Sequence, residues 1–121
     1  MKRWFSSLGH AMRGVIVFFR TERNARIELF FALVAIFLGC ILHISAIEFC
    51  MVLLCIAAVI GAEAINSAIE LLANFQTREI HPAIRDIKDI SAGAVLITSV
   101  IALVVGILIF GPRVILLIAG T

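Results

Sequence analysis

The stretch FCMVLLCIAAVIGAEAINSAIELL, residues 49–72, joins a long apolar run to two glutamates near its end. The spacing i, i+3, i+4 and i+7 relates its four polar side chains, Glu63, Asn66, Ser67 and Glu70. On a helix this spacing places them on one face. Carboxylates and amides inside a membrane-spanning segment are costly, so they are functional candidates. The stretch predicts a membrane helix with a polar stripe that serves a chemical purpose.

The composition of the chain indicates an integral membrane protein. The 121 residues are 63% hydrophobic with a mean hydropathy of +1.17, which is too apolar for a soluble domain. The net charge of +2 is too small to suggest nucleic-acid binding. Three cysteines without CxxC spacing argue against a disulfide framework or a zinc site. We therefore expect an all-α membrane fold that comprises residues 1–121 as one domain.

Three apolar segments are long enough to cross the hydrocarbon core of a bilayer, which needs about 20 residues. We expect transmembrane helices over residues 27–47, 49–73 and 90–110, with a loop over residues 74–89. Gly111-Pro112 is expected to end the third span, because proline interrupts the helical hydrogen bonds. The apolar tail over residues 114–119 either extends this span or lies at the membrane interface.

Lysine and arginine are distributed unevenly about these spans. Of the ten, six precede the first span and three lie in the 74–89 loop, whereas only Arg113 follows the third span. The positive-inside rule then places the N-terminus and the 74–89 loop in the cytoplasm.

Residues 1–26 carry a different pattern, in which apolar and basic side chains recur with helical periodicity. The apolar positions are Trp4, Phe5, Leu8, Met12, Val15, Phe18 and Phe19, and Arg3, His10, Arg13 and Arg20 lie among them. This pattern is typical of an amphipathic helix on the inner leaflet, with its arginines near lipid phosphates. Such a helix is either a simple membrane anchor or a surface that gathers a lipid substrate.

The depth of the two glutamates in the membrane separates their roles. If the second span begins near Glu48, the helical rise places Glu63 about 22 Å and Glu70 about 33 Å along the helix. Glu63 is then expected just below the cytoplasmic headgroups, at the depth of a lipid hydroxyl, and Glu70 at the interface itself. The ion-coupling carboxylate of a small transporter is more often near the middle of the bilayer.

Other charged side chains are expected at the same membrane surface. They are the carboxylates Glu22, Glu28, Glu79, Asp86 and Asp89 and the phosphate-binding candidates Arg78, His81, Arg85 and Lys88. One or two carboxylates with phosphate oxygens usually hold Mg²⁺, and basic groups bind phosphates. Together these groups suggest phosphoryl transfer to a membrane-borne alcohol. The alternatives are polar groups that only hydrogen-bond across helices, a small transporter or channel subunit, and a catalytically inactive scaffold.

Three motifs resemble those of the prokaryotic diacylglycerol kinase family, which includes the undecaprenol kinases. They are EAINSAIE (residues 63–70), TERNARI (residues 21–27) and HPAIRDIKDISAGAV (residues 81–95), and the likeness extends from Arg3 to Phe110. The resemblance implies a homotrimer in the bacterial inner (plasma) membrane. Each subunit would have a surface helix and three transmembrane helices, and neighbouring subunits would share the active sites.

The resemblance also implies a role for each matching residue in an ATP- and Mg²⁺-dependent lipid kinase. Glu63 would be the general base, Asn66 would help to hold the catalytic centre, and Glu22 and Glu70 would ligate the Mg²⁺ that accompanies ATP. The nucleotide contacts would come from Arg3, His10, Glu22, Glu70, Glu79, His81, Lys88 and Asp89. The lipid contacts would come from Arg3, Glu63 and Ala92.

Two positions depart from the usual pattern of the family. Asn74 stands where the signature usually ends in aspartate, and His10 stands where some members have tyrosine. We expect diacylglycerol as the acceptor, which would give phosphatidic acid. The alternative is undecaprenol, which would give undecaprenyl phosphate. The His81-Pro82 loop and the His43-Ile44-Ser45 turn look closer to the undecaprenol kinase branch.

Overall fold

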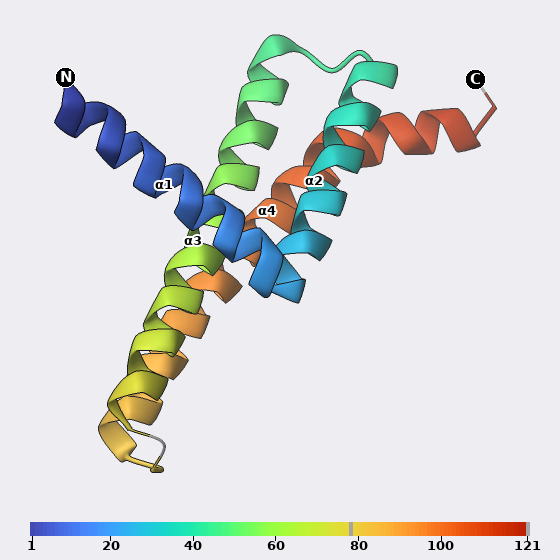
Figure 1. Ribbon diagram of the computed structural model, residues 1–121. Coiled ribbons are helices and arrows are strands. Elements are labelled where there is room, and N and C mark those ends of the chain that lie inside the picture. Colours follow the sequence, from blue (N-terminus) through green and yellow to red (C-terminus); the bar gives the residue numbers. More distant parts are fainter. Residues whose placement is uncertain (78, 121) are drawn as a thin grey trace.

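The computed structural model describes residues 1–77 and 79–120, and in this part of the chain it contains four α-helices (Figure 1). In chain order they are α1 (Lys2–Thr21), α2 (Arg23–Ile41), α3 (Ala46–Gln76) and α4 (Pro82–Ile118). The helices α2, α3 and α4 are long and apolar enough to cross a membrane. The expected all-α fold with three apolar helices of membrane-spanning length is therefore confirmed.

The longest helices, α3 and α4, form an antiparallel hairpin. Figure 1 shows them side by side, while α2 packs against α3 and α1 against α2. We call the end of the hairpin around residues 76–82 the turn end, and the opposite end, where α3 begins, the open end. At 1.5 Å per residue α3 and α4 are about 46 and 55 Å long, which exceeds a hydrocarbon thickness of about 30 Å. Because charged residues gather at the turn end, we expect helical turns at this end to extend beyond the apolar core of the membrane.

The connection at the turn end is shorter than the loop expected over residues 74–89. The helix α3 continues to Gln76, and α4 already begins at Pro82. His81 is the N-cap of α4, and its Nδ1 accepts a hydrogen bond from the backbone N–H of Ala83 at 3.2 Å. Proline suits the first helical turn, where a backbone donor is not needed. Both helices exceed the expected spans, since hydropathy marks the membrane boundary and not the helix end.

Pro112 lies inside α4, so the helix continues past Gly111-Pro112, where the apolar pattern breaks. Proline removes one helical hydrogen bond and bends a helix, and α4 changes direction in its C-terminal part (Figure 1). The Arg113 guanidinium donates a hydrogen bond of 2.8 Å to the carbonyl of Ile109, close to this interruption. Membrane helices tolerate proline where other groups form hydrogen bonds with the backbone carbonyls near it. The 114–119 tail therefore extends α4, which ends at Ile118.

A break at Glu22 separates α1 from α2, so the N-terminal helix is shorter than the expected 1–26. The backbone of Glu22 is extended, with φ −101° and ψ 113°. Arg26 closes the corner from α2, because its Nη1 donates to the carbonyls of Phe19 at 3.0 Å and Arg20 at 2.8 Å. These carbonyls belong to the last turn of α1, which lacks helical donors. The first membrane helix therefore begins directly after Glu22.

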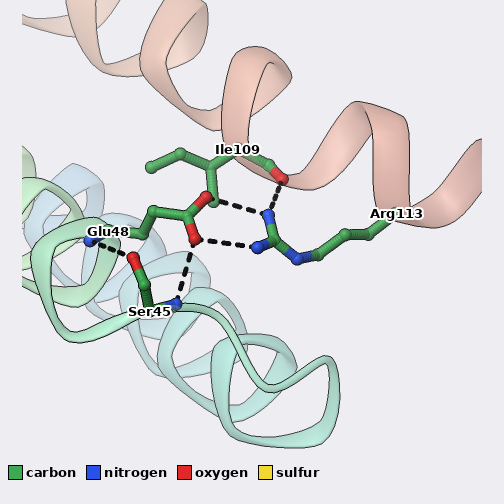
Figure 2. A network of polar contacts seen from close by, with 4 residues as sticks. All are labelled: Ser45, Glu48, Ile109 and Arg113. Atoms are coloured by element: carbon green, nitrogen blue, oxygen red, sulfur yellow. Dashed lines mark hydrogen bonds and ion pairs between the residues drawn. The ribbon is translucent and has the colours of Figure 1, made fainter.

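The helix α2 ends at Ile41, earlier than the expected residue 47, because a capping box starts α3. The Ser45 hydroxyl accepts a hydrogen bond from Glu48 N at 3.1 Å, and Glu48 Oε1 accepts one from Ser45 N at 3.0 Å (Figure 2). Such reciprocal bonds satisfy two backbone donors at a helix start. His43 precedes them with a positive φ of 54°, which turns the chain between the helices.

An ion pair fastens the open end of the hairpin (Figure 2). Arg113 Nη1 donates to Glu48 Oε2 and Arg113 Nη2 to Glu48 Oε1, both at 2.8 Å. A bidentate pair of this kind is among the stronger polar contacts in proteins. Within residues 1–77 and 79–120 it is the only salt bridge. It joins the first turn of α3 to the C-terminal part of α4.

The buried apolar core of the single chain is small. It is centred on Ile44, Val52 and Ile109, whereas most large apolar side chains on α1 to α4 are exposed. An apolar surface of this extent is covered by lipid or by other subunits. The expected homotrimer stays a prediction.

Candidate functional site

The polar stripe predicted on α3 is buried. Glu63, Asn66 and Ser67 have exposed fractions of 6%, 7% and 5%, and Glu70 is half-buried one turn further on. Ser91, on α4, is buried as well. Burying polar groups is costly unless they find partners. The burial of the stripe therefore reduces the stability of the fold.

Two acceptor oxygens near this stripe are buried without a hydrogen-bond partner in the described part of the chain. They are Oδ1 of Asn66 and Oε2 of Glu28, which lies on α2. The amide nitrogen of Asn66 donates to Glu70 Oε1 at 3.4 Å, so the orientation of this side chain leaves Oδ1 free to accept. Unpaired buried acceptors are rare and need an explanation. Each of these two oxygens therefore lacks the partner that a buried acceptor normally has.

Carboxylates from α2, from α3 and from the break between α1 and α2 interact electrostatically around Glu63. Glu63 experiences the negative charges of Glu22 and Glu70, and Glu28 experiences that of Glu63. Among the described residues none of these four carboxylates takes part in a salt bridge. Negative charges in a poorly solvated site require a compensating cation or proton. The structure thus brings together the predicted residues Glu22, Glu63 and Glu70 and adds Glu28 to them.

The same carboxylates include the expected ligands of Mg²⁺. In the part of the chain that the structure describes, no group of three or more His, Cys, Asp or Glu side chains is arranged to hold a metal ion. Mg²⁺ is commonly held by one or two carboxylates together with phosphate oxygens. Glu22 and Glu70, which form no salt bridge among the described residues, fit this second arrangement, in which the substrate supplies the remaining ligands.

Four of the predicted nucleotide contacts line a cavity of about 330 Å³ at the turn end. They are Glu79, His81, Lys88 and Asp89, and among the described residues the lining also includes Asn74, Thr77, Ile80, Ile84 and Arg85. Arg78, another expected phosphate contact, lies outside the described residues. The volume is at the lower end of the range for small-molecule sites. Its ammonium and guanidinium groups are of the kind that bind phosphates. This cavity is the candidate nucleotide site.

Two other predicted nucleotide contacts, Arg3 and His10, lie apart from this cavity in the single chain. Both are exposed on the N-terminal half of α1, and Figure 1 shows this half far from the turn end. Ala92, a predicted lipid contact, is exposed on α4. One chain therefore does not assemble the whole predicted site.

A larger, apolar cavity of about 740 Å³ lies among α2, α3 and α4. Its lining includes Phe31, Ala32 and Ala35 from α2, Val52, Ile56 and Ile60 from α3, and Leu103, Gly106 and Phe110 from α4. Glu28 and Ser99 are polar residues in this lining. Because Glu28 also interacts with Glu63, the apolar cavity borders the carboxylate cluster. A cavity of this kind suits a long apolar chain that carries a polar end.

Two residues of these sites are not predicted by the sequence patterns. Glu28 has the pattern of a charge at the start of the first span, although it lies inside residues 27–47, where an intramembrane carboxylate is a functional candidate. Asn74 stands out in the sequence only as a departure from a motif. Its contact with the cavity depends on the packing of α3 against α4, which no local pattern predicts.

Comparisons with known proteins agree with these features. The chain matches the family described as prokaryotic diacylglycerol kinase over residues 9–110. It is 35% identical to the undecaprenol kinase of Bacillus subtilis over 113 residues, which cover 93% of this chain and 92% of that protein. It is 33% identical to the diacylglycerol kinase of Synechocystis sp. over 101 residues, which cover 83% of this chain and 58% of that protein. The chain therefore belongs to the prokaryotic diacylglycerol kinase family and is a lipid kinase.

Proposed function

We propose that this protein is an ATP-dependent undecaprenol kinase, which forms undecaprenyl phosphate. The observation that carries this proposal is the end-to-end likeness to the undecaprenol kinase of Bacillus subtilis, over 93% of this chain and 92% of that protein. The diacylglycerol kinase of Synechocystis sp. is covered over only 58% of its length. Diacylglycerol, the acceptor expected from the sequence, is the second candidate and is supported by that relative.

The proposed acceptor site joins the apolar cavity to the carboxylate cluster. The apolar lining between α2, α3 and α4 would hold the hydrocarbon part of the lipid. The hydroxyl would lie at Glu63, in the part of the fold that also contains the unpaired acceptors Asn66 Oδ1 and Glu28 Oε2. Glu63 is the natural general base, since it is the most deeply buried carboxylate of the cluster.

The proposed reaction uses few groups of the protein directly. Glu63 takes the proton of the lipid hydroxyl, and the hydroxyl oxygen forms a bond to the γ-phosphorus as the bond to the β–γ bridging oxygen breaks and ADP leaves. Lys88 and Arg85 would neutralise phosphate charge in the turn-end cavity. Glu22 and Glu70 would hold Mg²⁺, which when bound compensates the charge of the donor phosphates.

The subunit arrangement and membrane orientation are part of the proposal. A homotrimer with shared sites would bring α1 of one subunit, with Arg3 and His10, to the turn-end cavity of its neighbour. The exposed apolar surfaces of α2, α3 and α4 support such an assembly. The N-terminus and the turn end would face the cytoplasm, where ATP is available.

A two-acceptor assay tests the proposed function. Purified protein in mixed micelles is incubated with γ-labelled Mg-ATP and, in parallel, with undecaprenol or diacylglycerol at equal mole fractions. We expect label mainly in undecaprenyl phosphate, and at least about 10²-fold slower labelling with Glu63→Gln. Preferential labelling of diacylglycerol would show that diacylglycerol, and not undecaprenol, is the preferred lipid substrate. Label in neither lipid would overturn the proposal and would return the transporter, channel and scaffold alternatives to consideration.

Mixed assemblies test whether sites are shared between subunits. Subunits that carry Arg3→Ala are combined with subunits that carry Lys88→Met, each variant being inactive or weakly active alone. If the site is formed between subunits, the mixture contains sites with both native residues and recovers activity. An unrecovered mixture, with co-assembly proven by differently tagged subunits, would contradict shared sites.

A further inference from the structure

A contact across the turn-end cavity links a charged residue to a neutral one. Lys88 Nζ, on α4, donates a hydrogen bond to the side-chain oxygen Oδ1 of Asn74, on α3. Both residues line the cavity, Lys88 being half-buried and Asn74 exposed. The contact therefore fixes the position of an ammonium group at the wall of the candidate nucleotide site.

The side chain at position 74, which accepts the hydrogen bond from Lys88, affects the net charge of the cavity. An amide oxygen orients an ammonium group through a hydrogen bond but carries no net charge, so the positive charge stays available to an anion. A carboxylate in the same place would form an ion pair with Lys88 and would compete with a phosphate for it. Within the described residues, the salt bridge at the open end is the only one, and Lys88 does not take part in it.

We infer that Asn74 is a positioning residue of the nucleotide site, which holds the Lys88 ammonium toward the cavity and leaves its charge free for a nucleotide phosphate. The inference rests on the proposed nucleotide site and extends it to a residue that sets the affinity for ATP. It implies that the neutral side chain at position 74 strengthens nucleotide binding relative to an acidic one.

A purely structural role for Asn74 makes a different prediction. If the contact only clamps α3 to α4, then Asn74→Asp keeps or strengthens the clamp through an ion pair, and both stability and nucleotide binding stay unchanged or improve. If Asn74 acts through the charge of Lys88, the same substitution keeps stability but weakens binding. A fall in affinity without a loss of stability therefore separates the two roles.

The test uses the full-length protein in detergent micelles. Binding of labelled Mg-ATP, without lipid acceptor, is measured by equilibrium dialysis, and KM and kcat are measured with acceptor present. With Asn74→Asp we expect Kd and KM for Mg-ATP to rise about two- to fivefold, the strength of an exposed ion pair, with kcat nearly unchanged. The melting temperature should be equal to or above that of the native protein.

Gln76→Glu is the matched control, because it adds the same charge at the end of α3 on an exposed residue that does not line the cavity. We expect it to leave Kd within the error of the native value. Asn74→Ala removes the acceptor without adding charge, so it should lower the melting temperature and raise Kd less than Asn74→Asp does. This second variant keeps the inference testable if Asn74→Asp does not fold.

A double-mutant cycle identifies Lys88 as the group through which Asn74 acts. In a Lys88→Met background, Asn74→Asp should change the Kd for Mg-ATP less than in the native background. An equal change in both backgrounds, or no change in either, would overturn the inference. If the native protein itself binds no Mg-ATP and labels no lipid, the proposed function has failed. If the native protein is active and only the Asn74→Asp effect is missing, the function stands and the inference alone is lost.

Discussion

The two ends of the α3–α4 hairpin use polar side chains in opposite ways. At the open end, Ser45, Glu48 and Arg113 pair with one another and with backbone groups, through a capping box and a bidentate ion pair. Toward the turn end, Asn66 has an unpaired acceptor, and Lys88 contacts a neutral partner. At the open end the charged groups pair with each other, whereas toward the turn end the charge of Lys88 and the buried oxygen of Asn66 have no such partner among the described residues.

This difference separates stability from function in physical terms. A polar group whose partner lies in the same chain stabilises the fold, whereas a buried polar group without such a partner costs free energy. Proteins keep such an unpaired group where a ligand supplies the missing hydrogen-bond partner. We therefore expect substitutions at the open end to change stability, and substitutions toward the turn end to change catalysis.

The largest effect is expected for Glu63→Gln. Glutamine is close in shape to glutamate but cannot take a proton from the acceptor hydroxyl, so kcat should fall about 10²- to 10⁴-fold. The melting temperature should not fall, since one of several mutually repelling carboxylates is neutralised. The measurement is transfer of labelled phosphate to undecaprenol in mixed micelles.

Asp86→Asn is the control for this prediction. Asp86 is an exposed carboxylate on α4 that does not line the turn-end cavity, so its neutralisation should leave kcat near the native value. A Glu63→Gln protein with near-native turnover would remove Glu63 from the role of general base and would weaken the contrast between the two ends.

A smaller catalytic effect is expected for Arg26→Met. Arg26 closes the corner between α1 and α2, directly beside the proposed metal ligand Glu22. Loss of its two hydrogen bonds should let Glu22 move and should raise the Mg²⁺ concentration for half-maximal activity by up to about tenfold, as for other groups that orient a metal ligand. Titration of activity with Mg²⁺ measures this shift.

The neighbouring exposed arginine gives the control for the corner. Arg23→Met removes a charge from the same helix start, and we expect it to leave the Mg²⁺ requirement unchanged. Equal shifts for Arg23→Met and Arg26→Met would show that net charge, and not the hydrogen bonds of Arg26, positions Glu22.

The ion pair at the open end predicts an effect on stability alone. Arg113→Met and Glu48→Gln should each lower the melting temperature by several degrees, and the double variant should lower it by less than the sum, because the two residues pair with each other. KM for Mg-ATP should not change. Additive losses in the thermal unfolding of the three variants would show that the pair does not act as a unit.

How far the sequence predicts this molecule depends on the range of each interaction. The stripe from Glu63 to Glu70 and the apolar helices follow from periodicity and hydropathy, which are local. The helix bounds are less accurate, because hydropathy locates the membrane, while His81 and Ser45 start helices through capping. The break at Glu22 depends on Arg26, which folds back onto the preceding helix.

The sites show the same limit. The resemblance to a family suggested Glu79, His81, Lys88 and Asp89 one by one, and the hairpin brings them to one cavity. The burial of Glu28 Oε2 and the contact of Asn74 with Lys88 result from packing between helices, so no spacing rule along the chain indicates them. Arg3 and His10 lie apart from this cavity in the single chain, so their expected contact with the nucleotide stays a prediction that rests on the proposed homotrimer.

The smallest effect is expected for Ser45→Ala, and it sharpens the comparison when it is set beside Asn74→Ala. Both substitutions remove one polar side chain from an exposed position of α3 or its N-cap, one at each end of the hairpin. Ser45→Ala removes an N-cap and should lower the free energy of unfolding by about 1 kcal/mol, with Kd for Mg-ATP unchanged. Thermal unfolding and equilibrium dialysis on the same samples measure both quantities.

Asn74→Ala should show the opposite balance, with a small loss of stability and a measurable loss of nucleotide affinity. The two variants together test whether the open end serves stability and the turn end serves nucleotide binding. Each variant is the other's control for a general disturbance of α3. If Ser45→Ala weakened nucleotide binding as much as Asn74→Ala does, the two ends would be coupled through the helix. The open end would then contribute to the catalytic site as well as to the fold.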